Sequence, residues 1–167
     1  MASIFELWVE CKDKESAEHL AQHFMGLKHT LLSGRTIKWN VQITLPPLDN
    51  LGVIVSSEDL RRHDFIRSLQ DTLESTEAGI RFYHHLQSAP DFRFAYVGWD
   101  ATSISMEGLL ERVDTWPNGE HNLDLACVVD DELYKKLGFP VFFQQFRDGY
   151  WWRAYDGESY RPILGQD

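Results

Sequence analysis

A possible metal-binding group near the N-terminus consists of Glu15, His19 and His23, which lie four residues apart. In a helix this spacing places all three side chains on one face. Two histidines four residues apart can bind one zinc ion, and a carboxylate is a plausible third ligand. The sequence shows neither a fourth ligand nor a His-Glu-x-x-His pattern beside them. We therefore expect a solvated helix flank and predict no metal site and no cofactor.

His84 and His85 form a second group, near the end of a predicted helix. Neighbouring residues are roughly 100° apart around a helix, so we expect one ring to be buried and the other exposed. A cationic side chain near a helix C-terminus also interacts favourably with the helix dipole. We interpret this pair as structural and predict no general acid–base histidine.

Asp130, Asp131 and Glu132 form a run of carboxylates of the kind that binds a divalent cation. They also follow a predicted strand directly and open a short helix. Acidic residues at that position accept hydrogen bonds from free backbone N–H groups and interact favourably with the helix dipole. We favour this capping role over a metal site.

Two cysteines, Cys11 and Cys127, are the remaining candidates for nucleophilic chemistry. Cys11 has only Lys12 and Lys14 as basic neighbours in sequence, which is weak support for a reactive thiolate. The chain also lacks a phosphate-binding glycine loop and the glycine pattern of a nucleophile elbow. We predict no catalytic residue. Two thiols fit a reducing compartment, although one bridge between them stays possible.

Acidic residues are concentrated between Phe94 and Tyr134. This segment holds nine carboxylates and one formal cation, Arg112, so it carries −8 of the chain's formal net charge of −10. Three of the carboxylates are spaced i, i+4, i+7 and share one face of a predicted helix. Such a surface either keeps the protein soluble or attracts a basic partner. The predicted partner-binding acids are Glu107, Glu111, Asp114, Glu120 and Asp124.

Aromatic residues are concentrated in the last part of the chain, where residues 139–160 include nine of them. Neighbouring side chains in a strand point to opposite faces, so both faces of this region are aromatic. One face can line the core, and the other is either covered by another element or offered to a partner. Aromatic and arginine side chains are typical of interface hot spots. The predicted partner-binding residues here are Trp151, Trp152, Arg153 and Tyr155.

The elements that position these residues follow from hydrophobic periodicity. Asp13 is expected to cap a first helix, because a helical repeat of apolar residues follows it. A capping-box pattern beginning at Ser56 predicts a second helix that runs to about Ser88, with a break or kink near Ser75–Gly79. The resulting order is β-α-β-β-α-β, the ferredoxin-like order of two split βαβ units. The predicted strands of this part are 3–10, 36–45, 51–55 and 92–99.

The C-terminal part ends in a predicted β-hairpin. The dipeptide Asp148-Gly149 separates two aromatic strands, 141–147 and 150–155. It is typical of a two-residue turn with positive φ at both central positions. A turn of this type pairs Phe146 with Trp151. The elements predicted before it are helices over 104–115 and 131–137 and a strand over 123–129.

Length and composition fit one folded domain. The chain has 167 residues, of which 43% are hydrophobic and 13% aromatic, so it can build a core without a metal or a disulfide. We predict a single α+β domain over residues 1–167, with an antiparallel or mixed sheet and helices mainly on one face. The N-terminal part, 1–100, and the C-terminal part, 101–167, are not expected to fold separately.

The termini and the charge bear on location and partners. The chain begins MASIFELWVECKDK, without a basic n-region, and it has no apolar run long enough to span a membrane. Its negative charge argues against binding to nucleic acid or to an anionic membrane. We therefore expect a cytoplasmic protein without nucleic-acid or membrane partners.

These observations favour binding over catalysis. We expect an acidic protein-binding module, in its most concrete form an inhibitor or immunity-type protein that neutralises a basic partner such as a toxin. Complementary charge would steer the encounter and aromatic anchors would hold the complex. Two alternatives stay open: a small-molecule-binding enzyme that uses histidine and carboxylate residues, and an oligomerising structural or regulatory subunit. The sequence does not define the oligomeric state.

Overall fold

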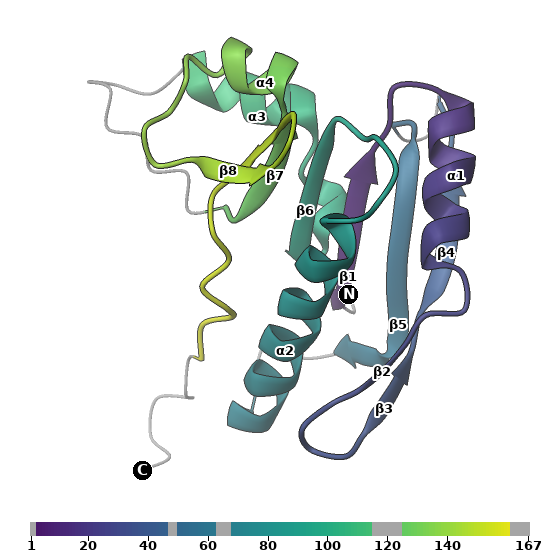
Figure 1. Cartoon of the computed structure of the whole chain (residues 1–167). Coiled ribbons are helices and arrows are strands. Elements are labelled where there is room, and N and C mark those ends of the chain that lie inside the picture. The colour runs from purple at the N-terminus through teal and green to yellow at the C-terminus, as the bar shows by residue number, and fades with distance from the viewer. Residues whose placement is uncertain (1–2, 47–49, 63–67, 115–124, 161–167) are drawn as a thin grey trace.

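The structure, a computed structural model, describes residues 3–46, 50–62, 68–114 and 125–160. Its centre is a seven-stranded sheet in which all neighbouring strands are antiparallel, in the order β4-β5-β1-β6-β7-β9-β8 (Figure 1). This confirms the predicted α+β fold with an antiparallel sheet and a C-terminal hairpin. The strands of the sheet are β1 (Ser3–Glu10), β4 (Asn40–Thr44), β5 (Gly52–Arg62), β6 (Phe94–Trp99), β7 (Cys127–Asp130), β8 (Gln144–Arg147) and β9 (Tyr150–Trp152).

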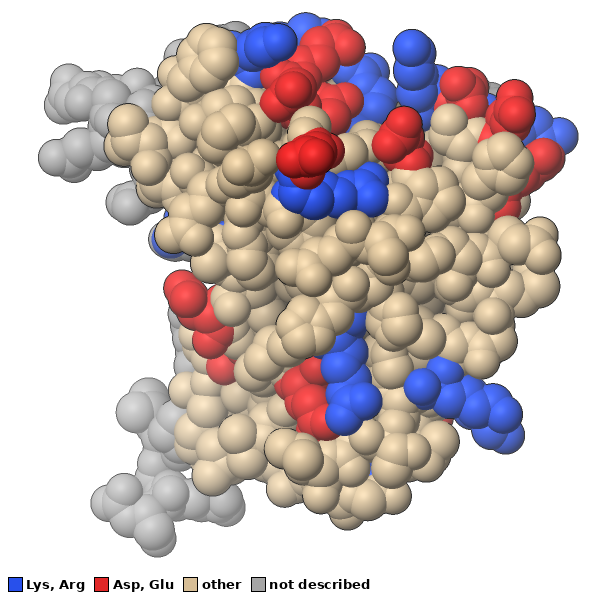
Figure 2. All heavy atoms as spheres, viewed as in Figure 1, with Lys and Arg blue, Asp and Glu red and all other residues tan. Residues whose placement is uncertain are grey.

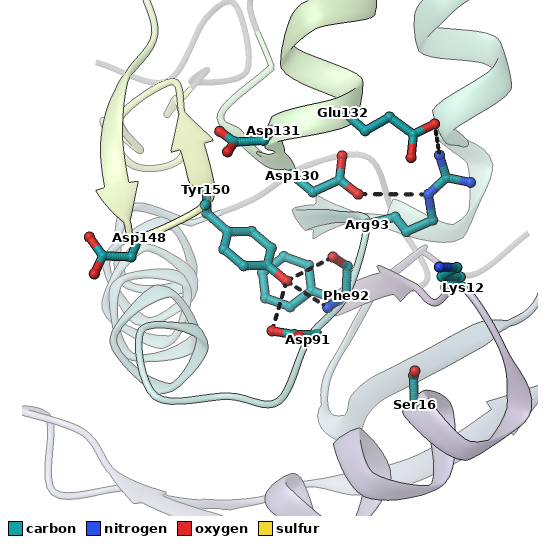
Figure 3. Close-up of a pocket in the computed structure, with 11 residues that line it drawn as sticks. Lys12, Ser16, Asp91, Phe92, Arg93, Asp130, Asp131, Glu132, Asp148 and Tyr150 are labelled. Carbon is teal, nitrogen blue, oxygen red and sulfur yellow. Dashed lines mark hydrogen bonds and ion pairs between the residues drawn. The ribbon is translucent and has the colours of Figure 1, made fainter.

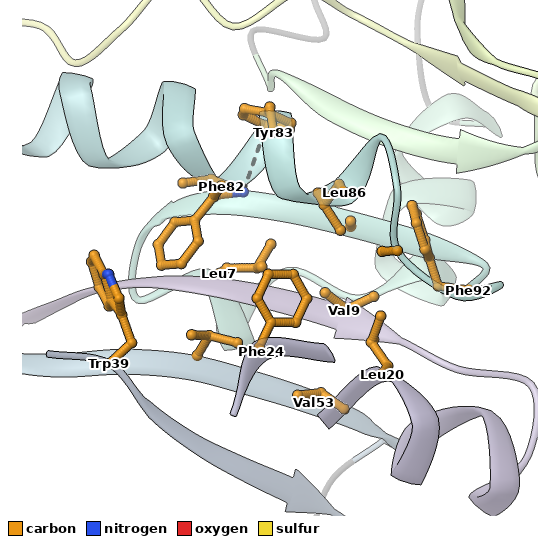
Figure 4. Packing of buried hydrophobic residues seen from close by; sticks show 14 of the residues in the cluster. Leu7, Val9, Leu20, Phe24, Trp39, Val53, Phe82, Tyr83, Leu86 and Phe92 are labelled. Atoms are coloured by element: carbon orange, nitrogen blue, oxygen red, sulfur yellow. Dashed lines mark hydrogen bonds between the residues drawn. The ribbon is translucent and has the colours of Figure 1, made fainter. Parts of the chain in front are cut away.

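Both faces of the sheet are covered. Leu7 and Val9 of β1 pack with helices α1 (Lys14–Phe24) and α2 (Leu69–Leu86), as Figure 4 shows. Trp8 points to the other face and joins a smaller cluster with helices α3 (Met106–Asp114) and α4 (Asp131–Lys136). The two longest helices therefore share one face, and the two shorter ones cover the other.

The start of α2 differs from the sequence prediction. The helix was expected to begin near Ser56, but β5 continues to Arg62, which pairs with Ser3 of β1. The helix begins after Ser68, whose side chain accepts a hydrogen bond from the backbone N–H of Asp71 at 3.1 Å. Both serines precede an acidic residue by three positions, so the local pattern is the same. Pairing with β1 decides which of them caps the helix.

Helix α2 also continues without the predicted break at Gly79. The ring of Tyr155 lies against this glycine, and a Cβ there would come within 2.6 Å of the ring. The glycine therefore permits close packing of the C-terminal segment on the helix and does not interrupt it.

The predicted strand 36–45 is divided in two. Residues Thr36–Lys38 form β3, which pairs with β2 (Lys28–Thr30) in a separate two-stranded sheet, and β4 joins the main sheet. The sequence analysis did not predict β2. Trp39, between β3 and β4, is buried beside Phe82 of α2 at a ring distance of 4.4 Å. We call the unit formed by β2, β3 and their connection (residues 28–38) the β2–β3 hairpin.

The C-terminal hairpin turns at Asp148-Gly149 as predicted, and Gly149 has φ 77°. Its details differ in two ways. Among the described residues other than glycine, positive φ occurs only at Asp100 and Phe139, so Asp148 does not share it. The strand pairing shifts between Gln145 and Arg147, and Gln145, not Phe146, lies opposite Trp151. The predicted register is therefore wrong beyond the turn, because a bulge at Phe146 inserts one residue.

None of the helices in the described part of the chain is long and apolar enough to cross a membrane.

Candidate functional site

A cleft of about 760 Å³ lies at one end of the sheet, where β1 ends, β6 begins and the β8–β9 hairpin turns. Figure 3 shows Tyr150 pointing to Asp91 and Phe92, and Arg93 lying beside Asp130 and Glu132, whereas the carboxylates of Asp131 and Asp148 point away from these groups. Figure 2 shows acidic side chains grouped at the upper part of the molecule, interleaved with lysines and arginines. The lining residues are Lys12, Ser16, Asp91, Phe92, Arg93, Asp130, Asp131, Glu132, Asp148, Gly149 and Tyr150.

The carboxylate run at the start of α4 supplies one wall of the cleft. Asp130 accepts a hydrogen bond from the backbone N–H of Leu133 at 2.7 Å, which confirms the predicted capping role. It also lies 3.7 Å from the guanidinium of Arg93. Burial raises the pKa of Asp130, although the helix N–H and Arg93 partly oppose that rise.

The next two acids of the run have different partners. Asp131 accepts a hydrogen bond from the indole N–H of Trp151 at 2.6 Å. Glu132 bridges Lys136 at 2.8 Å and Arg93 at 3.4 Å, and the hydrogen bond from Lys136 lowers the pKa of this exposed carboxylate. Three consecutive carboxylates thus cap a helix, orient an indole and hold two cations.

The opposite wall is aromatic. Phe92 and Tyr150 pack with ring centroids 4.6 Å apart, and the backbone N–H of Phe92 donates to the Tyr150 hydroxyl at 2.9 Å. The guanidinium of Arg147 lies 4.1 Å from the Tyr150 ring centroid and donates to the carbonyl of Ala89. Burial raises the pKa of Tyr150, so its hydroxyl stays protonated near neutral pH. This wall is therefore held in place from several sides.

The charge of the cleft is negative. Its lining includes five carboxylates and two cationic side chains, Lys12 and Arg93. The side chain of Asp91 is 95% exposed, and Asp148 is exposed at the turn. No histidine is among the described lining residues, and the described part of the chain holds no group of three or more His, Cys, Asp or Glu side chains arranged for a metal. Such a surface suits recognition of a cationic group.

The predicted acidic patch on α3 is a different surface. Glu107 and Glu111 are both exposed and lie one helical turn apart. Asp114 ends the same helix, but its side chain lies outside the described residues, as do Glu120 and Asp124 entirely. The structure therefore brings two of the five predicted acids together, and neither of them lines the cleft.

The predicted aromatic anchors do not share one face. Trp151 stacks on Tyr134 of α4 with ring centroids 4.4 Å apart, whereas Trp152 packs against Tyr83 of α2 at 5.5 Å. Tyr155 also lies against Tyr83, at 5.3 Å. Helices thus pack against both faces of this segment, although all three rings stay partly accessible.

Arg153, the remaining predicted residue of this group, follows β9. Its guanidinium carbon lies 5.9 Å from the ring centroid of Phe142, and its side chain is partly exposed. This places Arg153 beside an aromatic ring at the edge of the described C-terminal segment.

Sequence reasoning missed a cluster of histidines between α1, α2 and the β2–β3 hairpin. It had grouped His23 with Glu15 and His19, yet both of those are exposed, while the His23 ring turns toward α2 and lies 3.1 Å from the carbonyl oxygen of His85. The Nε2 atoms of His85 and His29 are 3.2 Å apart. The prediction that one of the adjacent histidines of α2 is buried and the other exposed is met only in part, because His84 is exposed and His85 is half-buried.

Comparisons with protein-family models, with curated proteins and with solved structures found no significant match to this chain. The candidate function therefore depends on the geometry and charge described above.

Proposed function

We propose that this chain is an acidic, cytoplasmic protein-binding module that neutralises a basic protein partner, in its most concrete form as an inhibitor or immunity-type protein. The observation that carries the proposal is the convergence of carboxylates in the cleft. Asp91 and Asp148 come from outside the acidic segment of the sequence, yet they line the same cleft as the carboxylate run at the start of α4. Three separate stretches of chain thus contribute negative charge to one concave surface.

The physics of such a surface favours a charged macromolecular partner. Exposed carboxylates raise the rate of encounter with a basic protein, and this effect weakens as salt screens the charges. Phe92 and Tyr150 are only 3% and 6% exposed, so their rings support the acids from below and offer little surface of their own. A lysine or arginine side chain of the partner could place its charge beside the exposed carboxylates of Asp91 and Asp148.

One observation favours a second candidate, a small cationic ligand. The cleft volume of about 760 Å³ lies within the range of small-molecule sites, roughly 300–1,000 Å³. An enzyme that uses histidine and carboxylate residues has less support in this cleft, because the described lining residues include no histidine.

A site-specific crosslink tests the proposal. A photo-crosslinking amino acid is placed at Asp148 in the cleft or, as a matched exposed control, at Asp156, which does not line the cleft. In lysate of the native host, we expect the Asp148 position to capture one protein with a strongly basic isoelectric point. Equal capture at both positions, or capture of acidic proteins, would contradict the proposal.

The captured partner then allows a kinetic test. Reversing Asp91 and Asp148 to lysine should slow association about tenfold or more at low salt. The control reverses Glu58 and Asp156, two exposed acids that do not line the cleft, and so changes the net charge equally. If both double variants slow association to the same extent, net charge and not the cleft is responsible.

A further inference from the structure

The hydrogen bonds of His29 define which of its ring nitrogens carries a proton. The indole N–H of Trp39 points at His29 Nδ1 at 3.1 Å. An indole nitrogen is only a donor, so Nδ1 must supply a lone pair. The proton of the neutral ring is therefore on Nε2, where it is donated to Nε2 of His85 at 3.2 Å. His85 must accept at that atom, and its own proton is then on Nδ1.

This arrangement has no tolerance for an added proton. A proton on His85 Nε2 would face the N–H of His29 across the same short distance. His29 cannot shift its own proton to Nδ1, because that proton would then face the indole N–H of Trp39. The two rings are also nearly parallel, with centroids 5.3 Å apart, so charged rings would repel each other. Both hydrogen bonds therefore require that both histidines are neutral.

The same tautomers disfavour a metal ion between the rings. Two nitrogen atoms 3.2 Å apart would suit two ligands of one zinc ion. Binding there would require His29 to lose the Nε2 proton while Trp39 still occupies its Nδ1 lone pair, or would require the indole hydrogen bond to break. The geometry thus favours proton sensing over metal binding.

The pair joins two units of the fold. His29 belongs to β2, Trp39 directly follows β3, and His85 belongs to α2. The β2–β3 hairpin is not part of the main sheet, so its opening leaves the pairing of that sheet intact, although Leu31 and Ile37 of the hairpin pack in the main core and would be exposed. Its base is held on α2 by the histidine pair and by the contact of Trp39 with Phe82.

The tip of the hairpin is held by different groups. Glu77 of α2 accepts a hydrogen bond from the backbone N–H of Leu32 at 2.9 Å. Glu74 accepts hydrogen bonds from Ser33 and Arg35, both at 2.9 Å. Burial opposes the charged form of Glu74, but the hydrogen bonds it accepts lower its pKa overall, so this carboxylate stays ionised in mild acid. Mild acid therefore leaves the tip anchored and acts on the base.

We propose that the His29–His85 pair is an acid-sensitive latch, which holds the β2–β3 hairpin on α2 while both rings are neutral and releases the base of the hairpin when His85 takes up a proton. His85 is the entry point because it is half-buried, whereas His29 is only 3% exposed. The inference does not depend on the proposed binding function.

The surrounding charges define the direction of the response. Burial is the main cause that lowers the pKa of both rings, that of His29 to about 4, so both are neutral at neutral pH. The nearby positive charges oppose protonation further, and Glu77 partly offsets them. The titratable or charged groups around the pair are His23 on α1; Glu77, Arg81 and His84 on α2; and Lys28 and Lys38 on the exposed face of the hairpin.

Imidazole nitrogen NMR of the full chain tests the tautomers. At pH 7.5 we expect the proton of His29 on Nε2 and that of His85 on Nδ1. A proton on Nδ1 of His29, or a protonated ring at either position, would overturn the inference.

Hydrogen exchange tests the release. Hydrogen-exchange rates of the backbone amides in residues 28–38, divided by their intrinsic rates, give the equilibrium constant for local opening. We expect this constant to increase at least tenfold between pH 7.5 and pH 5. Amides in β1 and β6 should change less than threefold. An unchanged hairpin, or a hairpin that opens together with β1, would overturn the latch.

Two glutamine variants sharpen this test. In His85→Gln the amide oxygen can accept from His29 but takes up no proton, so the acid-induced opening at pH 5 should fall at least threefold. His19→Gln, at an exposed histidine of α1 that is not among the groups around the pair, is the matched control and should behave like the wild type. If the acid-induced opening of the hairpin increases as much in His85→Gln as in the wild type, His85 is not the group whose protonation releases the hairpin. The wild-type measurements decide the question even if the variant is less stable.

Discussion

In the cleft at the end of the sheet, each carboxylate is exposed to water or lies beside a cation or an N–H donor. Under the β2–β3 hairpin, the imidazole rings of His29 and His85 are shielded from water. They remain neutral because their two hydrogen bonds form only between neutral rings. Both sites gather residues that are far apart in the sequence. We propose that the first presents charge to a partner, whereas protonation of the second loosens the packing of the hairpin.

The two sites differ in how much stability is lost when a polar residue is replaced. An exposed carboxylate can be replaced with little loss of stability, because water replaces its partners. A buried ring that satisfies a second buried group cannot, because its removal leaves a donor without an acceptor. Substitutions under the hairpin should therefore lower the free energy of unfolding, and substitutions in the cleft should mainly change binding.

The largest effect is expected for His29→Ala, which should destabilise the protein by about 3 kcal/mol. The change removes a ring that is only 3% exposed and leaves the indole N–H of Trp39 without its acceptor. Denaturant unfolding at pH 7.5 measures the loss. His84→Ala on the exposed side of α2 and Asp148→Ala in the cleft should each cost less than about 0.5 kcal/mol. Similar losses in all three variants would remove the distinction between the two sites.

The pH dependence of stability should follow the histidine site. His29 titrates near 6.5 when unfolded and at about 4 in the folded protein, so the unfolded chain takes up the proton first as pH falls. Stability is therefore complete above pH 6.5 and declines toward pH 4, by about 2 kcal/mol at pH 5 from this one group. Burial raises the pKa values of Glu6 and Asp130, which offsets part of the loss in acid.

Calorimetric unfolding between pH 7.5 and pH 5 measures this decline. In His29→Ala the pH-dependent contribution of His29 to stability is absent, so the free energy of unfolding should change less with pH over this range. A variant with the same slope as the wild type would assign the pH dependence to other groups.

The sequence could predict the elements that depend on short-range signals. Asp13 and Asp130 cap their helices as expected, and Asp148-Gly149 forms the expected turn, because each signal acts within three or four residues. The start of α2 could not be predicted in this way. Ser56 and Ser68 carry the same capping pattern, and only the long pairing of β5 with β1 distinguishes them.

The candidate sites were less predictable for the same reason. Asp130, Asp131 and Glu132 were recognised as a group because they are consecutive, but no local signal connects them with Asp91 or Asp148. The sequence groups His19 with His23 by helical spacing and His84 with His85 by adjacency, whereas the packing of three elements brings His23, His29 and His85 together. The unpredicted strand β2 carries His29, so the cluster could not be inferred without it.

A smaller loss than that of His29→Ala is expected for the backbone that shapes the cleft. Gly149 has φ 77° and lines the cleft, and an added Cβ would meet no described atom within 4 Å. Gly149→Val should therefore cost about 1–3 kcal/mol through backbone strain alone. Gly149→Asn should cost clearly less, because asparagine tolerates this conformation. Equal denaturant midpoints for Gly149→Val and Gly149→Asn would show that the positive φ is not the cause of the lost stability.

The smallest effect on stability, and a large one on binding, is expected for the acids of α3. Glu107 and Glu111 are exposed, so reversing each to lysine should change stability by no more than about 0.5 kcal/mol. If this face steers the basic partner, the double reversal should slow association by about tenfold or more at low salt. The loss should shrink in high salt, because the screening length falls from about 10 Å at 0.1 M to about 3 Å at 1 M.

The same measurement separates α3 from the cleft. Association rates for the Glu107/Glu111 reversal and for the Asp91/Asp148 reversal are compared with those of the Glu58/Asp156 control at equal net charge. A loss confined to the Asp91/Asp148 variant would place recognition in the cleft and make the α3 acids a solvated face. A loss confined to the α3 variant would mean that the carboxylates of the cleft, despite their convergence, serve mainly to cap α4 and to hold Arg93 and Trp151 in place.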